Sequence, residues 1–203
     1  MPSKNVGNGS TQEKILQESM RLFLERGYHG TSIDDITRAA GITKGALYWH
    51  FKNKEELLTR IVEEYEKRFL NNLILTVEAV KGGVLDKFEK YIHFNSAFAY
   101  YNRELCVSFE TLAAELVGTH DGIEPEFRRI YNKYQAFLSD MIMQGKKEGV
   151  FKEELDPNLS ALTIMAIQHG ALFQWSMNRD VINGEIFVKT FKKIMLCGLK
   201  SGL

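Results

Sequence analysis

The stretch "TSIDDITRAAGITKGALYWHFKNKEELL", residues 31–58, decides the fold predicted for this chain. Ser32, Thr43 and Asn53 each stand where a side-chain oxygen caps the first turn of a helix, and an acid follows Ser32 three residues later. Gly41 stands where a left-handed residue ends a helix, and only "GIT" separates that end from the next start. Two short helices joined by a tight, glycine-containing turn form a helix-turn-helix unit, which is the unit predicted here.

The second helix of this unit places its side chains on two sides when each residue turns by about 100°. Leu47 and Phe51 lie four residues apart and share one side, which we expect in the core. The opposite side carries Gly45, Tyr48, Trp49 and Lys52. A monomer rarely exposes a tyrosine and a tryptophan together without a reason. Packing of Trp49 on the rest of the protein is one reason, and contact with the DNA major groove is the other.

The rest of the 203-residue chain also has the pattern of helices, and nothing in it predicts a strand. Ser10 and Glu13 predict the start of a first helix that Gly27 ends. The later predicted helices span about 54–80, 85–101, 103–117, 125–146, 157–178 and 184–199. We expect an all-α protein with a flexible tail at 1–9, a helix-turn-helix domain at 10–53 and a helical domain at 54–203.

Composition and charge limit where the protein can be located in the cell and which partners it can bind. The sequence has no run of about eighteen apolar residues, so no membrane span is predicted, and its N-terminus lacks the apolar stretch of a signal peptide. Cys106 and Cys197 lie far apart without metal-ligand spacing, which favours a reduced, cytoplasmic protein. The formal net charge is zero, but residues 1–54 hold eight basic and five acidic residues. A slightly basic N-terminal region therefore precedes a slightly acidic remainder.

Catalytic and metal-binding motifs are absent from the sequence. It contains no glycine-rich phosphate loop, no G-x-S-x-G nucleophile motif and no Glu-x-x-His pair. His93, His120 and His169 are scattered without the spacing of metal ligands. We therefore expect neither an enzyme nor a metal or cofactor site.

Residues 30–58, "GTSIDDITRAAGITKGALYWHFKNKEELL", resemble the DNA-binding signature of the tetracycline-repressor (TetR) family of transcriptional regulators. The resemblance implies an all-α fold, in which a three-helix helix-turn-helix DNA-binding domain precedes a helical ligand-binding and dimerisation domain. It also implies DNA contacts by Thr31, Lys44, Gly45, Tyr48, Trp49, His50 and Lys54. To these we add Ser32 and Thr43 at the two helix starts, where backbone N–H groups point outward.

The function implied by this resemblance is that of a repressor that binds a palindromic operator as a dimer and is released by a small, apolar or aromatic molecule. A transcriptional activator of the same fold is the first alternative. A helical protein-interaction module that does not bind DNA is the second. The homodimer is expected to form through the last two long helices, because residues 157–178 are apolar nearly all round.

The effector pocket is expected among aromatic and polar residues in the middle of the chain. Helix bundles that keep a cavity line it with aromatic side chains and a few polar ones. The candidates are Phe94, Asn95, Phe98, Phe109, Tyr131, Tyr134, Gln168, His169, Phe173 and Trp175.

Overall fold

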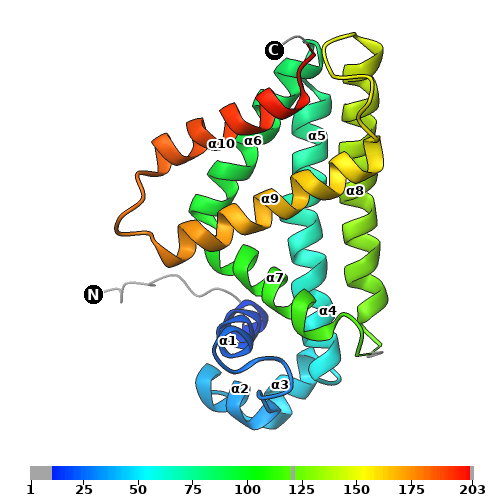
Figure 1. The fold of residues 1–203 in the computed structure, drawn as a ribbon. Helices are drawn as coiled ribbons and strands as arrows, with labels where there is room; N and C mark the ends of the chain where they lie inside the picture. Colours follow the sequence, from blue (N-terminus) through cyan, green and yellow to red (C-terminus); the bar gives the residue numbers. More distant parts are fainter. Residues whose placement is uncertain (1–10, 120–121, 202–203) are drawn as a thin grey trace, which may run out of the picture. The chain divides into compact units, whose positions relative to one another are not determined.

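The computed structural model of the chain describes residues 11–119 and 122–201 (Figure 1). These residues are almost entirely helical, and an isolated antiparallel bridge between Phe151 and Lys200 is the β-structure among them. The predicted all-α class is confirmed. The tail at 1–9 and the capping role of Ser10 lie outside the described residues. No helix in the described ranges combines the length and apolar character needed to cross a membrane.

The helices follow the predicted ranges closely, with one exception described below. They are α1 (Thr11–Arg26), α2 (Ile33–Ala40), α3 (Lys44–His50), α4 (Lys54–Tyr65), the π-helix η1 (Glu66–Asn71), α5 (Asn72–Glu78), α6 (Val84–Tyr101), α7 (Arg103–Leu116), α8 (Glu124–Lys147), α9 (Pro157–Met177) and α10 (Gly184–Leu199). The predicted bounds of the last two helices agree to within one residue.

The chain divides into two compact units. The first unit comprises the residues up to Tyr65 together with Glu104–Phe127, so it holds α1 to α4 and almost all of α7. The second comprises Glu66–Arg103 and Arg128–Leu203. In the first unit α1 packs on α2 and α4, and α2 packs on α3. In the second unit α6 packs on α5 and α10. In this division α4 and α7 group with the helix-turn-helix, and the domain boundary at residue 53 stays a prediction.

The helix predicted to run unbroken from 54 to 80 changes its type at Glu66. The Glu66 carboxylate accepts hydrogen bonds from the Arg129 guanidinium at 2.9 and 2.6 Å. The Lys133 ammonium bonds to Glu66 at 2.8 Å and to the Asn71 side chain at 2.7 Å. Lys133 thus bridges Glu66 and Asn71, which are five residues apart. Five residues is also the spacing of the backbone hydrogen bonds in a π-helix. The hydrogen bonds from Arg129, and then those from Lys133, lower the pKa of Glu66 to about 2.

A carboxylate that accepts two backbone hydrogen bonds holds the turn between α1 and α2. Gly27 ends α1 with a φ of +75°, a left-handed conformation that favours glycine. The backbone N–H groups of Tyr28 and His29 then donate to the Glu115 carboxylate of α7, at 2.8 and 3.0 Å. A Cβ at Gly27 would lie 3.0 Å from that carboxylate. Glu115 therefore fixes the chain just before α2, although 86 residues separate it from His29.

Replacing Glu115 with Ala is expected to release this turn. Two backbone N–H groups would lose their acceptor, which costs about 1–3 kcal/mol of unfolding free energy. Amide hydrogen exchange provides the direct measurement, since the Tyr28 and His29 amides should exchange faster in the variant. Glu115→Gln, which keeps one acceptor oxygen, should be intermediate. Thr111→Ala is the matched control, because Thr111 is an exposed residue one turn earlier on α7. Equal exchange in Glu115→Ala and the control would contradict the role given to Glu115.

Candidate nucleic-acid interface

The short helix α3 separates buried from exposed side chains as the sequence predicts. The Ala46 N–H donates to the Thr43 hydroxyl at 3.2 Å, which confirms Thr43 as the N-cap. Leu47 is fully buried and Phe51 is 1% exposed, whereas Tyr48 is 52% exposed. Trp49 is 85% exposed, so the alternative in which Trp49 packs on the rest of the protein is wrong.

Two other predicted contact residues of α3 lie on or beside the same exposed side. Gly45 is exposed and His50 is half-buried, and Lys52, which follows the helix, is exposed. Gly45 lies in open space, because the nearest atom that an added Cβ would meet is the Thr43 hydroxyl at 3.9 Å. The glycine therefore leaves the backbone of α3 uncovered on this side.

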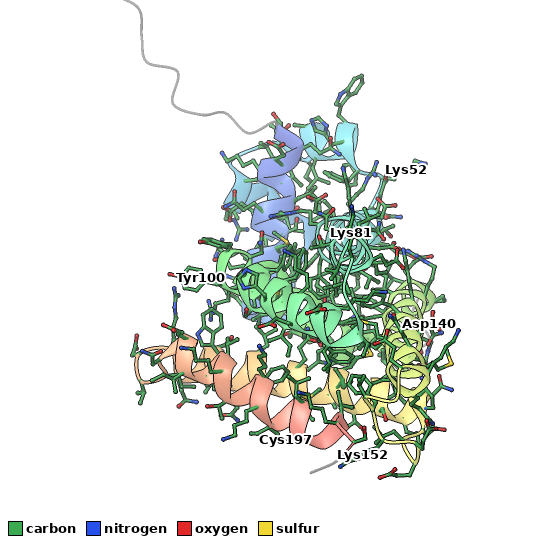
Figure 2. All side chains as sticks on the ribbon, turned by 90° about the horizontal axis from the view of Figure 1, so that it is seen from above. Lys52, Lys81, Tyr100, Asp140, Lys152 and Cys197 are labelled. Carbon is green, nitrogen blue, oxygen red and sulfur yellow. The ribbon has the colours of Figure 1, made fainter. Side chains whose placement is uncertain are left out.

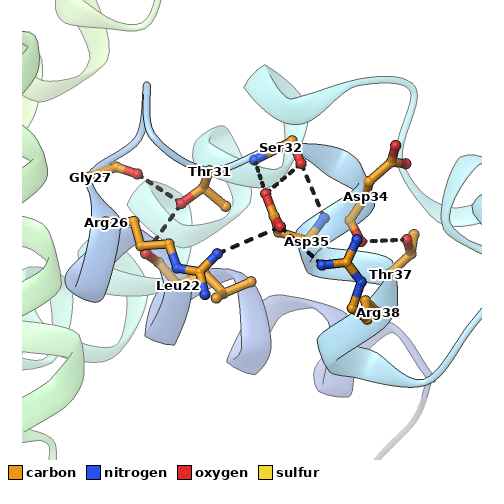
Figure 3. Close-up of polar contacts among 9 residues, drawn as sticks. All are labelled: Leu22, Arg26, Gly27, Thr31, Ser32, Asp34, Asp35, Thr37 and Arg38. Carbon is orange, nitrogen blue, oxygen red and sulfur yellow. Dashed lines mark hydrogen bonds and ion pairs between the residues drawn. The ribbon is translucent and has the colours of Figure 1, made fainter.

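The start of α2 is a closed network of hydrogen bonds (Figure 3). The Ser32 hydroxyl accepts the Asp35 N–H at 3.1 Å, and the Ser32 N–H donates to the Asp35 carboxylate at 3.1 Å, which confirms the predicted capping box. The hydrogen bonds from Ser32 are the main cause of a lowered Asp35 pKa. Arg26 and Arg38 lie 3.5 and 3.6 Å from the same carboxylate.

Thr31 is placed differently from what the resemblance implied. It is 1% exposed, and its hydroxyl donates to the carbonyls of Gly27 at 2.8 Å and Leu22 at 3.2 Å (Figure 3). Its N–H donates to the Tyr28 carbonyl at 3.3 Å. In the free protein Thr31 therefore anchors the turn after α1, and its DNA contact stays a prediction.

Lys54 also makes contacts inside the protein. Its ammonium donates to the carbonyls of Tyr28 at 2.8 Å and Thr31 at 3.0 Å, and it lies 4.1 Å from the centroid of the Tyr28 ring. A cation above an aromatic face gains electrostatic energy from the ring. Lys54 thus holds the turn from the side of α4 as Glu115 holds it from α7. Its contact with a phosphate remains a prediction.

Most cations of residues 11–54 are paired in the free protein. Arg21 bonds to Glu18 and Glu25. The Lys44 ammonium lies 2.6 Å from the Asp34 carboxylate, and the hydrogen bond to Asp34 raises the pKa of Lys44. Among these described residues, Lys14 and Lys52 have ammonium groups without a carboxylate or carbonyl partner. The positive potential of this surface is therefore smaller than its count of basic residues indicates.

The second unit brings several of the predicted pocket residues into contact with one another. The hydroxyls of Tyr91 and Tyr134 both donate to the Gln168 side-chain oxygen, and the Gln168 amide donates to Asn95 at 2.5 Å. Phe94 and Phe98 stack with centroids 6.0 Å apart. The Tyr131 ring meets His169 edge-on at 5.7 Å, and burial lowers the pKa of His169 to about 4.

Three other pocket candidates lie elsewhere. Phe109 belongs to the first unit, where it stacks on Tyr65 at 3.7 Å. Phe173 is 61% exposed, and Trp175 lies next to Tyr100, which Figure 2 labels on α6, and to Arg179. The sequence reasoning missed two central members of the cluster. Tyr91 is fully buried, and burial raises the pKa of its hydroxyl. Phe69 contacts Phe94, Phe98 and Tyr134.

A family model described as "Bacterial regulatory proteins, tetR family" matches residues 15–61, from α1 into α4. The match contains the whole helix-turn-helix with its exposed Tyr48 and Trp49. The helix-turn-helix region of the chain is thus that of the tetR family of bacterial regulatory proteins. This match agrees with the resemblance found in residues 30–58.

Relatives match this chain over most of its length. The HTH-type transcriptional repressor DhaR of Mycobacterium sp. (strain GP1) is 25% identical over 169 residues, which are 83% of this chain and 84% of DhaR. The crystal structure of the MbdR regulator from Azoarcus sp. CIB has a TM-score of 0.84 at 26% identity, covering 95% of this chain and 100% of that one. AibR in complex with isovaleryl coenzyme A and operator DNA has a TM-score of 0.74 at 20% identity, covering 91% and 97%, and shows likeness of fold alone.

Removing the exposed rings should separate DNA binding from stability. Tyr48→Ala and Trp49→Ala are expected to change the unfolding free energy by less than about 0.5 kcal/mol, because both rings face solvent. Each should weaken duplex binding about tenfold, since a side chain that touches bases contributes about 1–3 kcal/mol. Tyr101→Ala is the control, because Tyr101 is 80% exposed but lies on α6. Fluorescence anisotropy with labelled duplexes measures the affinities. A loss of folding in Tyr48→Ala with unchanged affinity of the remaining folded protein would assign Tyr48 to the core instead.

Proposed function

We propose that this protein is a ligand-responsive transcriptional repressor that binds a palindromic DNA operator as a homodimer. The observation that carries the proposal is the pair of exposed rings, Tyr48 and Trp49, on a short helix whose other side is buried. The second helix of a helix-turn-helix enters the major groove, where such side chains meet base edges and the backbone. The protein would act in the cytoplasm, where bacterial DNA lies.

Dimerisation is supported by the apolar side chains that α9 leaves exposed. Residues spaced three or four apart lie on one face of a helix. The exposed residues of α9 with this spacing are Leu159, Leu162, Ala166, Gly170, Phe173 and Met177. On α10, Ile186 and Ile194 are 63% and 62% exposed. Exposed apolar surface of this extent is typical of a protein interface, and a twofold pair of heads would match a palindrome.

The effector is proposed to be a small molecule whose buried part is apolar or aromatic and uncharged. The cluster around Tyr134 is made of rings, two tyrosine hydroxyls and two side-chain amides. His169 is neutral there at physiological pH, since its pKa is about 4. AibR, which shares the fold, is described in complex with isovaleryl coenzyme A. An acyl thioester is therefore one effector class to test, and uncharged aromatic compounds are the other.

The proposed dimer predicts the effect of a charge on α9. Phe173→Glu should give a monomer in sedimentation velocity at micromolar concentration, because a carboxylate would have to be buried in an apolar interface. Leu75→Glu is the matched control, since Leu75 is 66% exposed but lies on α5. Cys197 gives a second readout: it is exposed on α10, where Figure 2 labels it, and Cys106 is buried. A thiol reagent should react with Cys197 faster in the monomer. A monomeric wild-type protein would contradict the proposal.

DNA and effector binding can be tested together. The wild-type protein should select a palindrome from a pool of random duplexes, with half-sites one helical turn, about 34–36 Å, apart. Isovaleryl coenzyme A and uncharged aromatic compounds are then screened by thermal shift. The best compound should weaken operator binding about 5–150-fold, and operator should weaken its binding by the same factor. Failure to bind any duplex would refute the proposed DNA-binding function. Equal affinity for the compound with and without operator would refute only the proposed ligand response.

A further inference from the structure

Two adjacent acids at the start of α2 do different work. Asp35 completes the capping box and is approached by Arg26 and Arg38. Asp34 accepts a hydrogen bond from the Thr37 hydroxyl with its backbone carbonyl, at 3.1 Å. Figure 3 shows the Asp34 carboxylate turned away from the Ser32–Asp35 network. Within the described part of the chain, the ion pair with Lys44 is the one contact of that carboxylate. The fold therefore does not require it.

The partner of Asp34 is Lys44, the first residue of α3. The Lys44 ammonium lies 2.6 Å from the Asp34 carboxylate, and the two side chains are 59% and 54% exposed. An ion pair so exposed to water is weak and opens readily. It nevertheless holds the lysine in the free protein at the edge of the face that presents Tyr48 and Trp49.

DNA would compete with Asp34 for this lysine. An ammonium that neutralises a phosphate contributes to affinity by releasing a counterion from the duplex. Lys44 can do so only after leaving Asp34, and the carboxylate then stays unpaired next to a polyanion. An unpaired carboxylate in that position attracts a cation from solution, which reduces the net release of ions.

We propose that Asp34 limits operator affinity by competing with DNA for the Lys44 ammonium. The proposal rests on the proposed DNA-binding function. No other carboxylate of the described helix-turn-helix residues has this position. Asp35 is already held by its own helix, and the remaining acids pair within α1 or lie outside α2 and α3. Asp34 thus weakens the interaction of the Lys44 ammonium with a DNA phosphate.

Asp34→Asn tests the competition without changing the size of the side chain. We expect a stable, folded variant that binds the duplex selected by the wild-type protein about two- to fivefold more tightly per head, the range spanned by exposed ion pairs. An unselected duplex of equal length should gain similarly, because phosphates carry no sequence. The plot of log affinity against log KCl should steepen by up to about one unit per head. The control is Glu63→Gln, which breaks the equally exposed Arg60–Glu63 pair on α4 and should change neither quantity.

A double-mutant cycle tests whether Asp34 affects DNA affinity through Lys44. In a Lys44→Ala background, Asp34→Asn should bring no gain, since the ammonium for which the carboxylate competes is gone. A full gain in that background would overturn the proposal, because Asp34 would then act by direct repulsion of phosphate. Weaker binding by Asp34→Asn would overturn it in favour of a contact between Asp34 and a base. A wild-type protein that binds no duplex would instead refute the proposed function, so the two failures are distinguishable.

Discussion

The DNA-reading helices depend on one carboxylate that they do not themselves contain. Glu115 accepts the N–H groups of Tyr28 and His29, and Lys54 binds the Tyr28 carbonyl from the other side. The turn between α1 and α2 begins at Gly27, whose left-handed conformation sets the direction in which the chain leaves α1. Thr31 closes the turn with its buried hydroxyl, and α2 starts at the next residues. The position of α3 follows from that of α2.

Features that depend on neighbouring residues could be predicted from the sequence. The caps at Ser32 and Thr43 and the left-handed Gly41 each involve groups within a few positions, so local pattern is sufficient. The two sides of α3 follow from helical spacing alone. Contacts between distant segments could not be predicted. Nothing near residue 28 indicates Glu115, and a stripe of aromatics does not reveal that Phe109 belongs to a different unit from Tyr134.

The change to π-helix at Glu66 shows the same limit. Apolar residues keep a helical period from 54 to 80, and that period does not tell an α-helix from a short π-helix. Lys133 of α8 bonds to Glu66 and Asn71, the first and last residues of the π-helix. The π-helix begins at Glu66, directly after Tyr65, where the first segment of the first compact unit ends. The change of helix type therefore coincides with a change of compact unit along the chain.

The divided make-up of the first unit has a consequence for its folding during synthesis. The ribosome adds about 5–20 residues per second. Glu115 is the 86th residue after His29, so it follows His29 by roughly 4–17 s of synthesis. Once Lys54 has been made, the nascent helix-turn-helix has its own caps and Lys54, but it lacks the α7 carboxylate for the rest of that interval. The helix-turn-helix would thus leave the ribosome before Glu115 can bind its first turn. That turn would reach its final hydrogen bonding only when α7 emerges.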